Sequence, residues 1–167
     1  MSYALRFLAI GFVLAGVCLS GIGAAHPQDQ PKLQLSEQEK KILDLTNEAR
    51  EKEKKPPLKP NPVLFEVARA HSANMAKKGE MNHVLDGKNP AQRLKAAGYD
   101  YSWTSENIAS GDTDWPLSAV MKTWMESQIH RDNILSDKVT EIGIGIAKDS
   151  KGEVYYTQVF AAPKKKP

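Results

Sequence analysis

The hydrophobic periodicity changes towards the end of the chain, and this change limits the folds open to it. The segment "TEIGIGIAKD" (140–149) alternates isoleucine with glycine, "DSKG" is typical of a turn, and "EVYYTQVFAA" (153–162) is a second β-type segment. Upstream, apolar residues recur every three or four positions, as in amphipathic helices. Helices followed by a terminal hairpin predict an α+β layered domain.

Four helices and one further strand are expected before the hairpin. Ser36 and Glu39 form a capping-box pattern, Asn61 with Pro62 is a good helix start, and Gly79 is a good helix end. The expected helices cover residues 36–55, 61–79, 90–98 and 115–127, and strand-like character appears at 103–108. The glycines between the isoleucines of 142–146 predict that another element lies close against that strand.

The first 25 residues have the three parts of a secretory signal peptide. Arg6 precedes the uncharged apolar run "FLAIGFVLAGVCLSGIG", and small residues precede a cleavage site after Ala25. An uncleaved anchor is the alternative, although its apolar length is marginal for a bilayer and contains several glycines. Lipoprotein processing at Cys18 is disfavoured, because Val17 stands where Gly or Ala is required. Residues 26–35 read as a flexible leader.

Cysteine content and charge exclude several classes of protein. Cys18 is the single cysteine, so cleavage leaves a mature chain without disulfides, cysteine nucleophiles or cysteine-ligated zinc. The formal net charge of +3 is too small and too evenly spread for nucleic-acid binding as the main role. No second apolar run is long enough to span a membrane. With the signal peptide pattern, we expect a protein that is secreted, extracellular or periplasmic. We also expect a monomer.

The four histidines differ in their surroundings. His26 lies in the leader, and His71 lies on an apolar helical stripe, as expected of a buried, hydrogen-bonded core residue. His83 and His130 lie at the edges of elements, where side chains face clefts. Two imidazoles with nearby carboxylates form a divalent-metal site if they converge, although 47 residues separate them and no known metal motif is present.

The segment "KTWMESQIHRDNIL" (122–135) raises a second possibility. If it is one helix, Glu126 and His130 are four residues apart and share a face. A hydroxyl nucleophile at Ser105 or Ser127 beside His130 is conceivable, but no nucleophile-elbow motif supports it.

The order of motifs is more informative than any spacing. The chain contains "LTNEAR", "ARAHSANMA", "NH", "SENIASG", "WMESQIHRDNIL", "TEIGIGIA" and "YYTQVF", in that order. Together they resemble the CAP superfamily (cysteine-rich secretory protein, antigen 5 and pathogenesis-related 1), also called the SCP domain, over residues 42–161. The absence of cysteines and the form "HRDNIL" are similar to its bacterial branch. The resemblance implies an α-β-α sandwich with a small, mainly antiparallel sheet, a CAP/SCP domain at 36–162 and a basic tail at 163–167.

The resemblance also implies a central cleft lined by two histidines and two glutamates, which in several members holds a divalent cation. Carried over, these are His83, Glu106 and His130, with His83 and His130 as metal ligands for zinc or another weakly bound divalent cation. The second glutamate position is occupied by Ser127, and Glu126 one residue earlier is a doubtful substitute. Asn107, next to Glu106, is expected to fix the strand by hydrogen bonding.

Three functions follow from the resemblance. The first is an extracellular binding module for a lipid, glycan or protein. The second is a metal-assisted hydrolase of a peptide or ester, with Glu106 as general base and zinc-bound water as nucleophile. The third is a structural envelope domain with a vestigial cleft, which the replacement of a glutamate by Ser127 supports.

Overall fold

The computed structural model of this chain describes residues 33–165. The predicted signal peptide and most of the predicted leader therefore lie outside the described residues. The elements, in chain order, are α1 (Glu37–Lys52), β1 (Lys59–Pro60), α2 (Pro62–Lys78), α3 (Pro90–Ala96), β2 (Tyr101–Asp112), α4 (Leu117–Glu126), α5 (Gln128–Leu135), β3 (Glu141–Lys148) and β4 (Glu153–Pro163). Within the described range, no helix is both long and apolar enough to cross a membrane.

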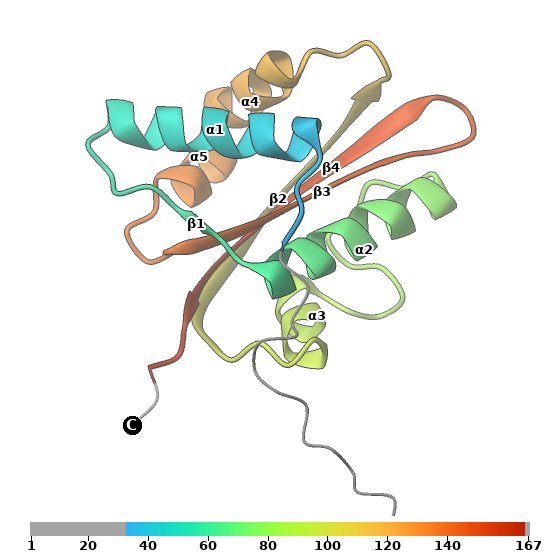
Figure 1. Ribbon diagram of the computed structural model, residues 1–167. Coiled ribbons are helices and arrows are strands. Elements are labelled where there is room, and N and C mark those ends of the chain that lie inside the picture. The colour runs from blue at the N-terminus through green and yellow to red at the C-terminus, as the bar shows by residue number, and fades with distance from the viewer. Residues whose placement is uncertain (1–32, 166–167) are drawn as a thin grey trace, which may run out of the picture. The chain divides into compact units, whose positions relative to one another are not determined.

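The elements form three layers. One mixed sheet, in the order β1-β3-β4-β2, has α1, α4 and α5 on one face and α2 and α3 on the other (Figure 1). The pairs β3–β4 and β2–β4 are antiparallel, and only the two-residue β1 runs parallel to β3. The predicted α-β-α sandwich with a mainly antiparallel sheet is confirmed.

The helix boundaries follow the capping residues in the sequence. Ser36 and Glu39 form both bonds of a capping box at α1, and Asn61 accepts from two backbone N–H groups at the start of α2. Gly79 ends α2 in the left-handed conformation, with φ of 62°, which glycine adopts without a Cβ clash. These three local predictions are confirmed.

The core lies on both faces of the sheet. The largest cluster joins Ile42, Trp124 and Phe160 between the sheet and the α1/α4/α5 layer, and all three are fully buried. On the opposite face, α2 lies directly on β3, because a Cβ at Gly143 or Gly145 would come within about 2 Å of the α2 backbone. The prediction of a close approach at these glycines is confirmed.

Three features differ from the sequence-based expectation. The strand expected at 103–108 is β2, which extends to Tyr101 and Asp112 because its whole length pairs with β4. The short β1 falls between the first two expected helices, where no strand was predicted. A fifth helix, α5, follows α4 after a break at Ser127, whose backbone is extended (φ −86°, ψ 120°).

The edge position of β2 determines where polar side chains gather. β2 ends the sheet, with α3 and α2 on one side of it and α5 on the other. Successive residues of a strand point to opposite faces. Glu106 accordingly meets residues of α2 and α3, whereas Asn107 meets α5.

Candidate functional site

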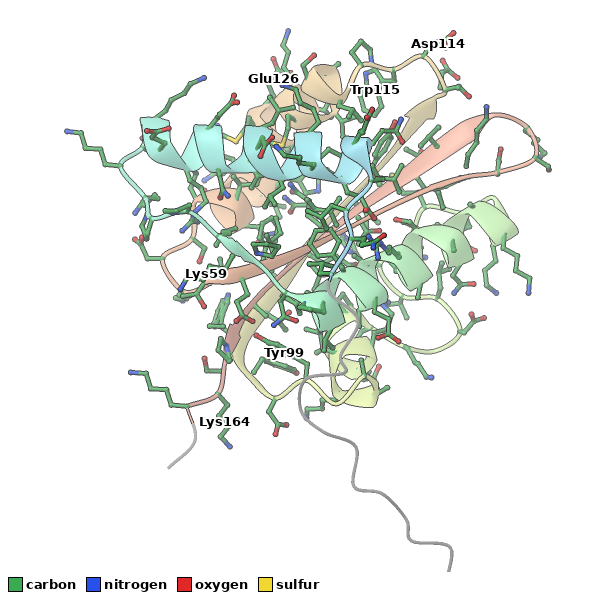
Figure 2. The ribbon with its side chains drawn as sticks, in the orientation of Figure 1. Lys59, Tyr99, Asp114, Trp115, Glu126 and Lys164 are labelled. Carbon is green, nitrogen blue, oxygen red and sulfur yellow. The ribbon has the colours of Figure 1, made fainter. Side chains whose placement is uncertain are left out.

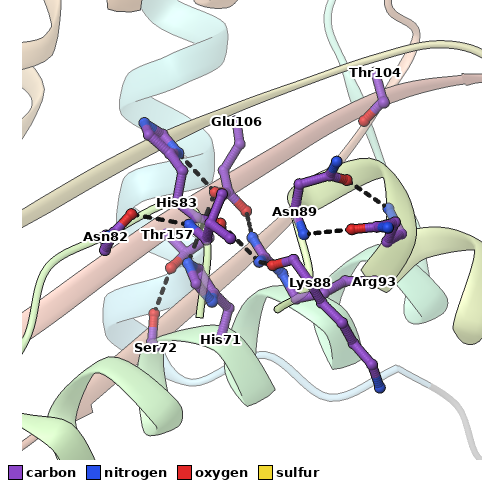
Figure 3. A network of polar contacts seen from close by, with 12 residues as sticks. His71, Ser72, Asn82, His83, Lys88, Asn89, Arg93, Thr104, Glu106 and Thr157 are labelled. Atoms are coloured by element: carbon purple, nitrogen blue, oxygen red, sulfur yellow. Dashed lines mark hydrogen bonds and ion pairs between the residues drawn. The ribbon is translucent and has the colours of Figure 1, made fainter. Parts of the chain in front are cut away.

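The polar cluster on the α2/α3 side of β2 is centred on the carboxylate of Glu106. This side chain is only 1% exposed, and both of its oxygens are engaged. Oε1 lies 2.8 Å from His83 Nδ1, and Oε2 accepts a 2.5 Å bond from Arg93 Nη2 (Figure 3). We call Glu106, His83, Arg93 and His71 the Glu106 network.

His83 reaches the network from the loop between α2 and α3. An Asx-type bond from the Val84 N–H to Asn82 Oδ1 shapes the chain around it. An ionised carboxylate can only accept, so in the neutral ring the hydrogen bond to Glu106 places the proton on Nδ1 and leaves Nε2 with a free lone pair. The side chain is 46% exposed, so that this second nitrogen is on the accessible part of the ring.

Arg93 holds the same loop from the other side. Its Nη1 donates to the carbonyl of His83 (2.8 Å) and to that of Lys88 (2.9 Å), while Nη2 binds Glu106. It projects from α3, whose start is fixed by a capping box between Asn89 and Gln92. One guanidinium therefore connects a helix, a loop and a strand. The charge-assisted bond to a buried carboxylate is among the stronger protein hydrogen bonds.

His71 of α2 completes the network from below the sheet. Its side chain is fully buried, and its Nε2 lies 3.7 Å from Glu106 Oε1. Neither ring nitrogen makes a well-aligned hydrogen bond among the described residues, although a contact with the backbone of Asn82 favours the protonated ring. Burial is the main reason why the pKa of His71 is lowered; the Glu106 charge opposes this effect and the Arg93 charge adds to it. The predicted burial is confirmed, and of the predicted hydrogen bonding there is only the contact with the Asn82 backbone.

His130 lies on the α5 side of β2. The Asn107 side chain donates to the His130 carbonyl and to Gln158, and it accepts from Asn133, so that α5 is tied to the strand. The prediction that Asn107 fixes the strand by hydrogen bonding is confirmed. Burial, and then the proximity of His83, lower the pKa of His130. Its Nδ1 is buried and has no partner among the described residues, in contrast to the oriented ring of His83.

Glu126 is placed differently from the expectation. α4 ends at Glu126 and α5 begins at Gln128, so Glu126 and His130 do not share one helical face, and that prediction is wrong. The Glu126 side chain is 67% exposed and lies 3.6 Å from Lys122 one turn back on α4. Figure 2 shows it on the outer helical layer. Ser127 caps neither helix with its side chain.

Sequence reasoning missed Arg93. Nothing in "AQRLKAAG" distinguishes a site arginine from an exposed one, except that Arg93 precedes Leu94, the buried residue of a short, capped helix. It also treated His71 as scaffold, because an apolar stripe gives no sign that a carboxylate of a distant strand lies next to it.

The side chains around Glu106 limit the kind of metal ion that could bind there. Imidazole nitrogens suit zinc and similar ions, and tight protein sites use three or four protein ligands. In the described part of the chain, no group of three or more His, Cys, Asp and Glu side chains is placed to hold an ion. Glu106 is committed to Arg93 and His83. An ion at this place would therefore have to rely on the imidazoles and on ligands supplied from outside.

Comparison with known proteins places this geometry in a family. A model of the cysteine-rich secretory protein family (CAP) matches residues 43–160. YkwD of Bacillus subtilis (strain 168), described as an uncharacterized protein, is 35% identical over 127 residues, which are 75% of this chain and 48% of that relative. The chain thus spans about half the length of this curated relative.

Solved structures agree with the fold. An extracellular protein containing an SCP domain from Bacillus anthracis str. Ames matches with a TM-score of 0.67 and 26% identity, over 78% of this chain and 45% of that one. An outer surface protein from Borrelia burgdorferi has a TM-score of 0.72 over 79% of this chain and 97% of its own, and at 23% identity it supports the fold alone. The chain belongs to the cysteine-rich secretory protein (CAP) family.

Proposed function

We propose that this chain is an extracellular binding module whose ligand is held by His83 and His130 at the edge of β2. The proposal rests on the hydrogen bonding of the Glu106 carboxylate. Both oxygens of its buried carboxylate are already engaged, by His83 and Arg93. A general base needs a free oxygen within reach of the proton that it removes. Glu106 therefore supports a role in orienting His83 better than a role as a base.

The protonation of the histidines supports a binding role as well. Burial lowers the pKa of His130, so this ring is neutral at physiological pH. In its neutral form, His83 presents Nε2 without a proton, because Nδ1 donates to Glu106. Two neutral imidazoles accept hydrogen bonds or ligate a divalent cation. A cation such as zinc would be held by His83 and His130, with its remaining positions open to water or to donor atoms of the ligand.

An extracellular location is part of this proposal. The signal peptide pattern at residues 1–25 supports it, and so does the similarity to an extracellular SCP-domain protein from Bacillus anthracis. The ligand would be a lipid, glycan or protein of that environment. The metal-assisted hydrolase is the second candidate, and it would need Glu106 to leave either Arg93 or His83.

Calorimetric titration with zinc chloride near neutral pH tests the proposal, with His83→Ala and His130→Ala as variants. We expect saturable binding that both substitutions abolish. In parallel, p-nitrophenyl acetate and casein would be tested as ester and peptide substrates. Hydrolysis that depends on zinc and on both histidines would contradict the binding role and favour the hydrolase. Folded protein without zinc binding would remove the cation from the proposal.

A further inference from the structure

Two histidines compete for one oxygen of Glu106. Oε1 lies 2.8 Å from His83 Nδ1 and 3.7 Å from His71 Nε2. His83 is half exposed and can exchange its hydrogen bond with water, whereas His71 is fully buried and has no other hydrogen-bond partner among the described residues. An unpaired buried polar group is costly, roughly 1–3 kcal/mol in proteins. The only other polar contact of His71 among the described residues is with the backbone of Asn82, and it is not a well-aligned hydrogen bond. On these grounds alone we would expect Glu106 to bond to His71, yet it is bonded to His83.

Arg93 accounts for this choice. It binds Oε2 and so anchors one oxygen of the carboxylate, and it also binds the backbone carbonyl of His83. The two contacts hold the carboxylate next to the backbone of the loop that carries the His83 ring. The third bond, to the Lys88 carbonyl, fixes the tight turn in which Asp86 and Gly87 both have positive φ. The Arg93 side chain is only 12% exposed, so water competes little for these bonds.

We propose that Arg93 is a positioning residue that pairs Glu106 with His83 rather than with His71. The Nε2 of His83 is thereby presented without a proton, free to accept a hydrogen bond or to ligate a cation. Without Arg93, the carboxylate would need only a small shift to bond the buried His71, because Oε1 is already 3.7 Å from its Nε2. The His83 ring would then lose its partner, and both of its tautomers would be populated. The inference rests on the proposed function in one respect: the outward Nε2 is the atom that binds the ligand or ion.

The tautomer of His83 is the direct readout. Long-range ¹H–¹⁵N correlation spectra of the imidazole rings distinguish a ring protonated at Nδ1 from one protonated at Nε2. We expect a single Nδ1-protonated form of His83 in the wild type and a mixture in Arg93→Met. Zinc affinity is the second readout, since losing the residue that orients a metal-binding histidine weakens binding by about 10- to 100-fold. Arg93→Lys keeps the charge but not the planar guanidinium, so its zinc affinity should lie between those of the wild type and Arg93→Met.

Two further variants separate positioning from general destabilisation. Arg69→Met is the matched control, because Arg69 also makes a two-point contact with a buried carboxylate, that of Glu39, outside the network. It should leave the His83 spectrum unchanged and the zinc affinity within about 2-fold of the wild type. Arg93→Met combined with His71→Leu removes the competing partner of Glu106. The combination should restore the Nδ1-protonated form of His83 and bring the affinity to within about 10-fold of wild type.

Four results decide the inference. A wild-type His83 ring that is protonated at Nε2 overturns it without any variant. A single unchanged tautomer in folded Arg93→Met, or in Arg93→Lys if the methionine variant does not fold, also overturns it. Failure of the His71→Leu exchange to restore the tautomer would show that His71 is not the competitor. If the wild type binds no zinc, the proposed cation site fails, while the spectra still decide the role of Arg93.

Discussion

Replacing Gly143 by alanine tests the close packing that brings α2, and with it His71, against the sheet. The backbone of Gly143 has negative φ, so an alanine there carries no conformational strain of its own. Its Cβ, however, would lie 2.0 Å from the carbonyl carbon of Leu64 and 2.3 Å from the backbone nitrogen of Phe65. Both are backbone atoms in the first turn of α2, and they cannot rotate away as the end of a side chain would.

The magnitude follows from the size of this overlap. Ordinary van der Waals contact at a Cβ begins near 3.4 Å, so α2 would have to retreat by more than about 1 Å. Leu64 and Phe65 are fully buried, and the retreat would open gaps around both side chains. Overpacking in a close-packed core costs about 1–3 kcal/mol, occasionally more, and a displaced helix belongs at the upper end. We therefore expect a loss of about 3 kcal/mol in the free energy of unfolding.

Urea unfolding near neutral pH, followed by circular dichroism, gives the two free energies directly. Gly79→Ala is the matched control, since a Cβ there has nothing within 4 Å and the cost comes only from a φ of 62°, about 1 kcal/mol. If Gly143→Ala unfolds with a free energy equal to that of Gly79→Ala, α2 does not lie on β3 as described, and the placement of His71 fails with it.

Three further outcomes are expected. The pKa of His71 is lower in the folded chain than the ordinary value of 6.5, so the unfolded chain binds more protons below about pH 7, and the free energy of unfolding should fall as the pH drops from about 7.5 to about 5.5. The urea midpoint should change less over this range in His71→Leu. An equal change in both proteins would contradict the lowered pKa of His71. Glu126→Ala should alter neither the zinc titration nor the free energy of unfolding by more than about 0.5 kcal/mol, since its pair with Lys122 is exposed; loss of zinc binding would show that Glu126 belongs to the site. Arg50→Met should lower the free energy of unfolding, measured by urea titration, by about 3 kcal/mol. Arg50 is 1% exposed and donates to three backbone carbonyls, two of them at the end of α5. A decrease below about 1 kcal/mol would refute this anchoring role.

Local signals in the sequence predicted much of the fold. The capping box at Ser36, the N-cap at Asn61 and the glycines of β3 act through neighbouring atoms or through a missing Cβ, and each was found where expected. The full length of β2 was not predictable, because its ends are set by pairing with β4, which lies far along the chain. The separate helix α5 was also missed, since "WMESQIHR" has no Pro or Gly to show that a second helix begins after Ser127.

The candidate site was predictable only in part. The resemblance of motifs indicated His83, Glu106 and His130, and the structure engages Glu106 with His83. Periodicity could not reveal that Arg93 occupies the second oxygen, or that His71 lies beside the first. Those contacts join residues that are distant in the sequence, and they depend on how α2 and α3 dock on β2. The role of Glu106 in orienting His83 therefore became apparent only from the three-dimensional arrangement.

A zinc-soaked crystal, with anomalous diffraction measured at the zinc edge, tests the central claim most directly. That claim is that Glu106 orients His83 while His83 and His130 face the ligand. It predicts an anomalous peak within bonding distance of His83 Nε2 and of His130, with Glu106 still bonded to Arg93 and to His83 Nδ1. A peak ligated by Glu106, or bound zinc that touches neither histidine, would contradict it.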